Sequence, residues 1–219
     1  MKKLILLLFI PLFFACGNDS KKEEEKKAST TKEVIEGNVK YYVDKDGKRQ
    51  GQGIWYYESG AIKIKVNYVD DKMQGVAIWY YESGAIEDKV YYVDDKRQGE
   101  RIRYYENGVV EGKANYVDDK MQGERIWYYE SGAVKNKVNF IDDKREGEKI
   151  WYYESGAVAG KDNYVDDKMQ GETIIYYESG AIYSKVNYVD GVRQGERIRY
   201  YENGAVEEIE NYIDGIIQD

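Results

Sequence analysis

Aromatic and arginine side chains recur at a fixed spacing and are the strongest candidates for a chemical role. Trp, Tyr and Arg are the residue types that most often anchor protein–protein contacts. One series repeats every 24 residues, with Ile175 as its aliphatic exception: Trp55, Trp79, Arg103, Trp127, Trp151 and Arg199. A second series is invariant: Tyr57, Tyr81, Tyr105, Tyr129, Tyr153, Tyr177 and Tyr201. Both series predict either a binding face or the core face of the fold, and the sequence leaves the two interpretations open.

Catalysis has few residues to use. The chain contains no His, and its single cysteine, Cys16, lies in the N-terminal segment. Glu and Asp are plentiful, but they recur in register, as Glu58 and its equivalents do, which favours a structural or surface role. We therefore expect no catalytic residues, no cofactor and a protein that is not an enzyme.

Aspartate pairs recur between strand patterns, and a calcium site would require several of their oxygens to converge. The pairs are Asp70-Asp71, Asp94-Asp95, Asp118-Asp119, Asp142-Asp143 and Asp166-Asp167. Asp is a common turn residue, and the glycine-rich nonapeptide of calcium-binding β-rolls is absent. The pattern predicts turn-forming aspartates and no metal site.

A 24-residue period organises the chain from about Lys40 onward. The motif Tyr-Tyr-Glu-(Ser/Asn)-Gly ends first at Gly60 and recurs without insertion. Each period contains two β-strand patterns, residues 54–58 and 61–69 in the first copy. Ser59-Gly60 predicts a two-residue primed turn, and the segment from Asp70 to Gly75 predicts a longer return turn.

The two-residue turn fixes which side chains share a face. It places Tyr57 opposite Ile62 and Tyr56 opposite Lys63, with Trp55, Tyr57 and Ile62 on the apolar face. We therefore predict an all-β fold, a single-layer, twisted antiparallel β-meander of stacked 24-residue hairpins. One lone strand, residues 40–44, precedes seven hairpins and gives about 15 strands.

The N-terminus resembles a bacterial lipoprotein signal peptide over residues 1–15. Lys2 and Lys3 precede the apolar stretch 4–14, and Ala15 stands before Cys16. The resemblance implies cleavage before Cys16 and lipidation of that residue, so that a lipid anchor holds the protein on a membrane. An ordinary secretory signal with an incidental cysteine is the alternative.

Residues 16–37 are predicted to be a lipid-anchored disordered tether, because they contain few apolar side chains, and residues 38–219 to be the repeat array. The lipoprotein resemblance implies, from Gly17 after the cysteine, a location at the outer membrane of the cell envelope. The run Lys21-Lys22-Glu23-Glu24-Glu25 resembles a surface-export signal, and the alternative is a solvated spacer. The net charge is −8 with no basic stripe, so we expect no nucleic-acid partner.

The repeat resembles the MORN repeat in its bacterial variant form. The segment 123–147 carries the motif clearly, with Glu-Arg-Ile-Trp-Tyr-Tyr-Glu-Ser-Gly followed by Asn-Phe-Ile-Asp. The resemblance covers essentially the whole array. It implies contacts with proteins and membranes, and bacterial relatives are often labelled YwqK-family antitoxins.

These observations are compatible with three functions. The leading hypothesis is a lipid-tethered, non-enzymatic binding or scaffold module with a protein partner, in which the aromatic face makes the contact. An antitoxin-like protein that neutralises a toxin is the second, and the lipid anchor argues against it. A structural spacer without a specific ligand is the third.

Overall fold

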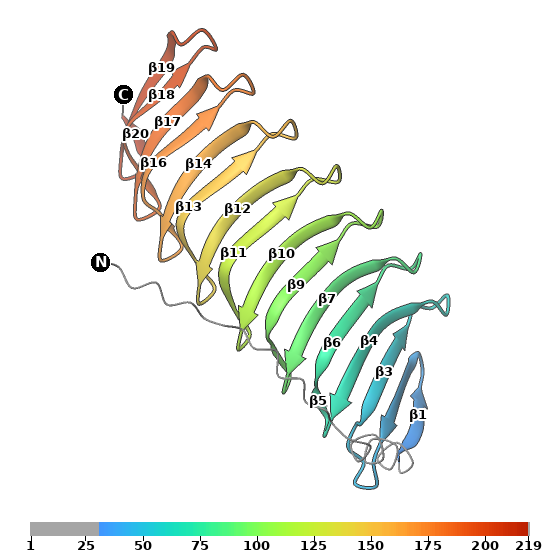
Figure 1. The fold of residues 1–219 in the computed structure, drawn as a ribbon. Helices are drawn as coiled ribbons and strands as arrows, with labels where there is room; N and C mark the ends of the chain where they lie inside the picture. The colour runs from blue at the N-terminus through green and yellow to red at the C-terminus, as the bar shows by residue number, and fades with distance from the viewer. Residues whose placement is uncertain (1–30, 219) are drawn as a thin grey trace, which may run out of the picture.

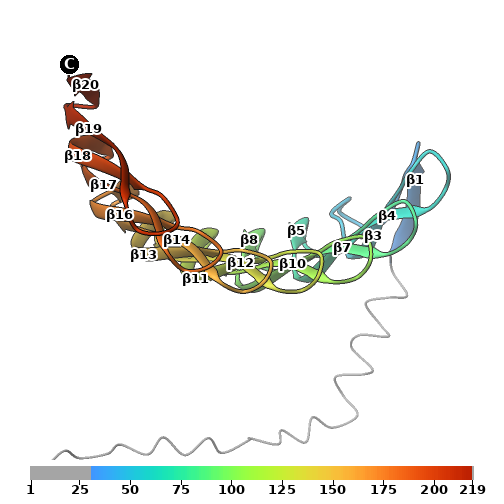
Figure 2. The ribbon, with the colours of Figure 1, turned by 90° about the horizontal axis from the view of Figure 1, so that it is seen from above.

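The computed structural model describes residues 31–218, and its strands form a single antiparallel sheet. The hairpins follow one another in chain order, and the sheet bends along its length into an arc (Figure 1, Figure 2). No helix occurs within the described residues. The predicted all-β, single-layer antiparallel meander is confirmed.

The strands are β1 (Lys32–Glu36), β2 (Val39–Val43), β3 (Gly51–Tyr56), β4 (Ile62–Val69), β5 (Lys72–Met73), β6 (Gly75–Tyr80), β7 (Ile86–Val93), β8 (Lys96–Arg97), β9 (Gly99–Tyr104), β10 (Val110–Val117), β11 (Lys120–Tyr128), β12 (Val134–Ile141), β13 (Lys144–Tyr152), β14 (Val158–Val165), β15 (Lys168–Met169), β16 (Gly171–Tyr176), β17 (Ile182–Val189), β18 (Val192–Tyr200), β19 (Val206–Ile213) and β20 (Ile216–Gln218).

The structure has 20 strands where the sequence predicts about 15. Part of the difference is subdivision, because the two-residue strands β5, β8 and β15 are each separated by one residue from the strand that follows. The rest is real, since β1 and β20 each add a strand at one end of the sheet.

Strand β1 lies inside the segment predicted to be a tether. It pairs with β2 along its whole length, from Lys32 opposite Val43 to Glu36 opposite Val39. The Nζ of Lys40 lies 2.7 Å from a carboxylate oxygen of Glu33, which adds an ion pair across this hairpin. The described sheet therefore begins at Lys32, inside the segment predicted to be a tether and before the predicted start of the array at residue 38. The predicted signal peptide, the lipidation of Cys16 and the remaining tether lie outside the described residues.

The two turns of each repeat have exchanged their predicted types. At the Ser-Gly end, the amide of Gly60 donates to the carbonyl of Tyr57 at 2.9 Å, and the amide of Tyr57 donates to Ala61 at 2.8 Å. With Gly60 at φ 86°, this is a three-residue loop with a glycine bulge. At the return end Val69 pairs directly with Lys72, so Asp70 and Asp71 alone form the turn.

That return turn requires positive φ at both central residues, and Asp70 and Asp71 have φ values of 50° and 70°. Such a primed turn matches the right-handed twist of the strands that it joins. Aspartate tolerates this conformation better than most side chains. The prediction of a two-residue primed turn was therefore placed at the wrong end of the hairpin.

A bulge limits the effect of the wrong turn on the register. Trp55 pairs with Ile64, as the predicted register requires, but Tyr56 pairs with Ile62 rather than with Lys63. Since directly paired residues share a face, Ile62 lies with Tyr56 and not with Trp55. The bulge moves Lys63 to the Trp55 side, so the predicted faces of Ile62 and Lys63 were wrong.

The buried side chains of the first repeats lie on the same face as the tryptophans. Val66, Tyr68 and Ala77 form a buried cluster, against which Trp55 and Trp79 pack. The tryptophans themselves are only half-buried, because no second layer covers this face within the described residues. One face therefore serves as the core of the sheet and also remains partly accessible.

Candidate binding face

A single row of side chains crosses the sheet through the tryptophan positions. Trp55 pairs with Ile64, and Ile64 pairs in turn with Trp79 of the next hairpin. The same alternation continues along the array, with neighbouring strands about 4.8 Å apart. In order, the row is Trp55, Ile64, Trp79, Asp88, Arg103, Gly112, Trp127, Asn136, Trp151, Gly160, Ile175, Ser184, Arg199 and Glu208.

The strongest variation between repeats lies on this side of the sheet. Five columns differ strongly from copy to copy; they begin at Gly53, Trp55, Lys63, Ile64 and Val66 and recur every 24 residues. We call these five columns the variable face. They place aromatic, cationic, acidic and small side chains next to one another on one surface.

The opposite side is nearly uniform. Five of its columns begin at Ile54, Tyr56, Ile62, Lys65 and Asn67, and we call them the constant face. The main exceptions on this side are Val76, Tyr91 and Ile209. The Ile54 column is isoleucine in every repeat and the Tyr56 column is tyrosine in every repeat. Two adjacent residues of one strand can therefore belong to a constant column and a variable column. The amount of variation between repeats depends on the face of the sheet and not on the strand.

The tyrosine column that begins at Tyr57 links each hairpin to the next. Its hydroxyls donate to backbone carbonyls 23 residues further along, at distances from 2.6 to 2.8 Å. The donors are Tyr57, Tyr81, Tyr105, Tyr129, Tyr153 and Tyr177. Tyr201, the last in the column, is 51% exposed. Six of the seven tyrosines predicted for the binding face thus use their hydroxyls to hold the stack together.

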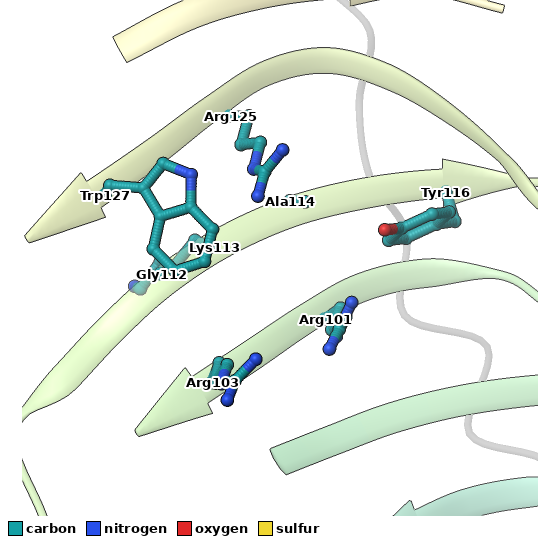
Figure 3. Close-up of a pocket in the computed structure, with 8 residues that line it drawn as sticks. All are labelled: Arg101, Arg103, Gly112, Lys113, Ala114, Tyr116, Arg125 and Trp127. Carbon is teal, nitrogen blue, oxygen red and sulfur yellow. The ribbon is translucent and has the colours of Figure 1, made fainter. Parts of the chain in front are cut away.

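Glycines in the row allow two tryptophans to lie flat on the neighbouring strand. A Cβ added at Gly112 would lie 2.8 Å from Trp127 Cε3, and one at Gly160 would overlap Trp151 Cζ2. Figure 3 shows the Trp127 ring over Gly112. These rings offer a broad aromatic surface and are only half-buried.

Arginine replaces tryptophan in the row at Arg103 and Arg199, and further charged side chains lie beside the row. Arg101 makes hydrogen bonds to both carboxylate oxygens of Asp88, at 3.1 and 2.9 Å from Nε and 2.5 Å from Nη2. Asp88 is buried, and these hydrogen bonds raise the pKa of Arg101. Arg103 lies 2.7 Å from Glu111, on the far side of the hairpin loop. Glu111 belongs to the Lys63 column, which places that column on the variable face.

The return-turn aspartates connect neighbouring hairpins. Asp119 accepts hydrogen bonds from the amide and the Nε of Arg97, both at 2.9 Å, and its own amide donates to the Arg97 carbonyl at 3.1 Å. Asp71 and Asp167 repeat this arrangement with Arg49 and Arg145. Residues 31–218 contain no cluster of acidic, His or Cys side chains suited to a metal ion. The aspartates form the return turns, as the sequence predicts, and they also link neighbouring hairpins, which it did not predict.

The sequence missed most of the variable face. Arg101, Arg125 and Asp88 were not predicted as site residues, although each replaces an aliphatic or small side chain of the first repeat. The signal that could have identified them is variation between internal repeats at alternate positions of a strand.

Fold and site together define a β-hairpin repeat array with one variable surface. The MORN repeat variant family matches residues 49–70, 73–94, 97–118, 121–142, 145–166, 169–190 and 193–214. The chain belongs to this family. Its repeats suggest a repeat scaffold or a binding role.

Other comparisons are distant. TarM shares 15% identity over 60% of this chain and 24% of its own length, with a TM-score of 0.26. The GtfA/B complex bound to UDP and GlcNAc shares 10% identity over 58% and 23%, with a TM-score of 0.21. A porin-like protein from Bacteroides uniformis shares 11% identity over 86% and 91%, with a TM-score of 0.23.

The chain spans about a quarter of the first two of these proteins. No curated protein matches it. In residues 31–218 no helix has the length and apolar character needed to cross a membrane.

Proposed function

We propose that the protein is a non-enzymatic binding scaffold whose variable face contacts a protein partner. The observation that carries this proposal is that the strongest variation between repeats lies on one face. A sheet that only has to stack its hairpins can use similar side chains in every repeat, as the constant face does. Five diverse columns on one face are what recognition of a specific, non-repetitive surface requires.

The side chains of the variable face suit a protein partner. Tryptophan and arginine are enriched at binding hot spots, and Trp127, Trp151 and Arg103 are half-exposed on one row. The net charge of −8 disfavours nucleic acid and anionic lipid as ligands of the array. The absence of His from the whole chain disfavours catalysis.

We also propose that the array is tethered to the cell envelope through a lipidated Cys16. The support is the sequence, in which Lys2 and Lys3, an apolar stretch and Ala15 precede the only cysteine. Cells fed a palmitate analogue should label the wild-type chain and not Cys16→Ser. Labelling that persists in Cys16→Ser would contradict lipidation at this residue.

The binding role is tested by crosslinked capture from intact cells. Trp127→Ala combined with Trp151→Ala should reduce recovery of a defined partner by at least about tenfold, because hot-spot truncations cost about 2 kcal/mol or more. The matched control is Lys137→Ala with Lys161→Ala, two residues of one constant-face column on the same hairpins. Circular dichroism should show an intact sheet for both pairs.

Equal recovery from the tryptophan variant and the wild type would contradict the proposal. Recovery of an adjacent-gene toxin would indicate an antitoxin-like role, and the absence of any reproducible partner would indicate a spacer.

A further inference from the structure

Four cations share one column of the variable face, and three of them have an acidic partner. Arg101 binds Asp88, Lys149 lies 4.0 Å from Asp162, and Arg197 lies 2.7 Å from Glu210. Arg125 is the fourth, and within residues 31–218 it has neither a hydrogen-bond acceptor nor an ion-pair partner. Its guanidinium instead stacks at 4.5 Å over the Trp127 ring.

The cross-strand neighbours explain why Arg125 is unpaired. Its direct partner on β12 is Val138, where Lys149 has Asp162 and Arg197 has Glu210. The strand on the other side, β10, presents Gly112 and Ala114 beside it, as Figure 3 shows. The repeat therefore keeps the cation and omits the carboxylate.

The surroundings make an unpaired cation costly. Arg125 is half-buried, and burial is the main cause that lowers its pKa; Tyr116 opposes this shift and Arg101 adds to it. A partly desolvated charge without a partner is unfavourable. Because Gly112 and Ala114 are small, the hollow between Arg125 and Arg101 stays open to solvent.

We propose that this hollow binds one carboxylate, from an Asp or Glu side chain of the protein partner, through the Arg125 guanidinium with Trp127 as the adjoining apolar contact. This inference rests on the proposed function. A guanidinium fork binds a carboxylate in a bidentate manner. Charge decides the class of ligand, since the other two arginines of the hollow, Arg101 and Arg103, are already neutralised by Asp88 and Glu111. One uncompensated positive charge matches a monoanion, whereas a phosphate dianion would be repelled by Asp88 and Glu111.

The test uses the isolated full chain and a small probe. N-acetyl-glutamate amide is titrated while NMR follows the Arg125 Nε–H and Trp127 indole signals, with N-acetyl-glutamine amide as the neutral control. We expect saturable shifts with a dissociation constant on the order of 10 mM, as suits a small ligand making one charged contact. Arg125→Gln should abolish the shifts, and Lys185→Gln, which removes a paired cation of the constant face, should leave them unchanged.

A second variant supplies the missing carboxylate within the chain. Val138→Asp copies the arrangement of Lys149 and Asp162 and should abolish binding of the probe while the sheet stays folded. The proposal is overturned by equal shifts with the glutamine probe, by binding that survives Arg125→Gln or Val138→Asp, or by tighter binding of inorganic phosphate. Because the probe replaces the partner, these outcomes are independent of whether the capture experiment succeeds.

Discussion

The hydroxyl of Tyr105 donates a 2.7 Å hydrogen bond to the backbone carbonyl of Tyr128 in the next hairpin. Corresponding bonds join six successive pairs of repeats. They lie near the Ser-Gly end of the hairpins, while aspartates connect the return ends. Each hairpin is thus fastened to the next at both ends, which leaves the middle of the strands free to vary on one face.

Tyr105→Phe should destabilise the array by about 1 kcal/mol, the usual net value of one hydrogen bond in a folded protein. Urea unfolding followed by circular dichroism measures the loss. Tyr201→Phe is the matched control, because the Tyr201 hydroxyl has no partner among the described residues, and it should be neutral. Equal losses in both variants would show that the hydroxyl bond is not the cause.

Gly112→Ala should displace the Trp127 ring. The added Cβ would lie 2.8 Å from Trp127 Cε3, and such overpacking costs about 1–3 kcal/mol. We expect a shift in tryptophan fluorescence together with lower resistance to urea.

The same Gly112→Ala change made in a Trp127→Ala variant distinguishes the steric clash from other effects of the substitution. With the ring removed, adding Gly112→Ala should be neutral or slightly stabilising, because alanine restricts the unfolded chain more than glycine does. A loss that persists in this background would refute the steric account.

Asp88→Asn should cost about 1–3 kcal/mol, since it leaves the half-buried Arg101 without its carboxylate. A double-mutant cycle with Arg101→Gln isolates the coupling between the two side chains. The double variant should be less destabilised than the sum of the single variants. Additive losses would show that the pair contributes no specific coupling.

Acid should weaken the links between return turns. Hydrogen bonds from the amide of Arg97 and then from its guanidinium lower the pKa of Asp119. Arg49 lowers the pKa of Asp71 in the same order, and at Asp167 the bond from the Arg145 guanidinium is the larger cause. A lowered pKa stabilises the fold above the unfolded value of about 3.9, and this contribution disappears as pH falls through the folded value.

The triple variant Asp71→Asn, Asp119→Asn, Asp167→Asn should therefore melt below the wild type at pH 7, with the difference closing by about pH 2. The control replaces three exposed hairpin-tip acids, Glu58, Glu106 and Glu154, by Gln and should melt near the wild type at both pH values. A constant difference across this range would contradict the linkage.

The sequence predicted the fold because the period is exact and each repeat contains one hairpin. It misplaced the turn types, because Ser-Gly is compatible with both a primed turn and a glycine bulge. Asp70-Asp71 was not recognised as a tight turn, because two consecutive non-glycine residues at positive φ are uncommon. The predicted pairing of Trp55 with Ile64 is nevertheless correct, because the bulge at Lys63 compensates for the different length of the Ser-Gly loop.

The site was predictable only in part. Trp127 and Trp151 stand out by residue type. Arg125 does not stand out, because its lack of an acidic partner becomes clear only by comparison between repeats. Val138 pairs with it from a neighbouring strand, and other repeats have an acid at the position of Val138. The predicted register already places Val138 opposite Arg125. Which carboxylate each cation reaches, as Arg101 reaches Asp88, depends on side-chain positions that the sequence does not give.

Adjacent residues of one strand provide the most direct test of the variable face. Trp127 and Ile126 are neighbours on β11 and belong to opposite faces. A photo-crosslinking amino acid introduced at either position in intact cells reports which face meets a partner. We predict a discrete protein adduct from position 127 and none from position 126. Equal adducts from both positions, or an adduct from position 126 alone, would contradict the assignment of binding to the variable face.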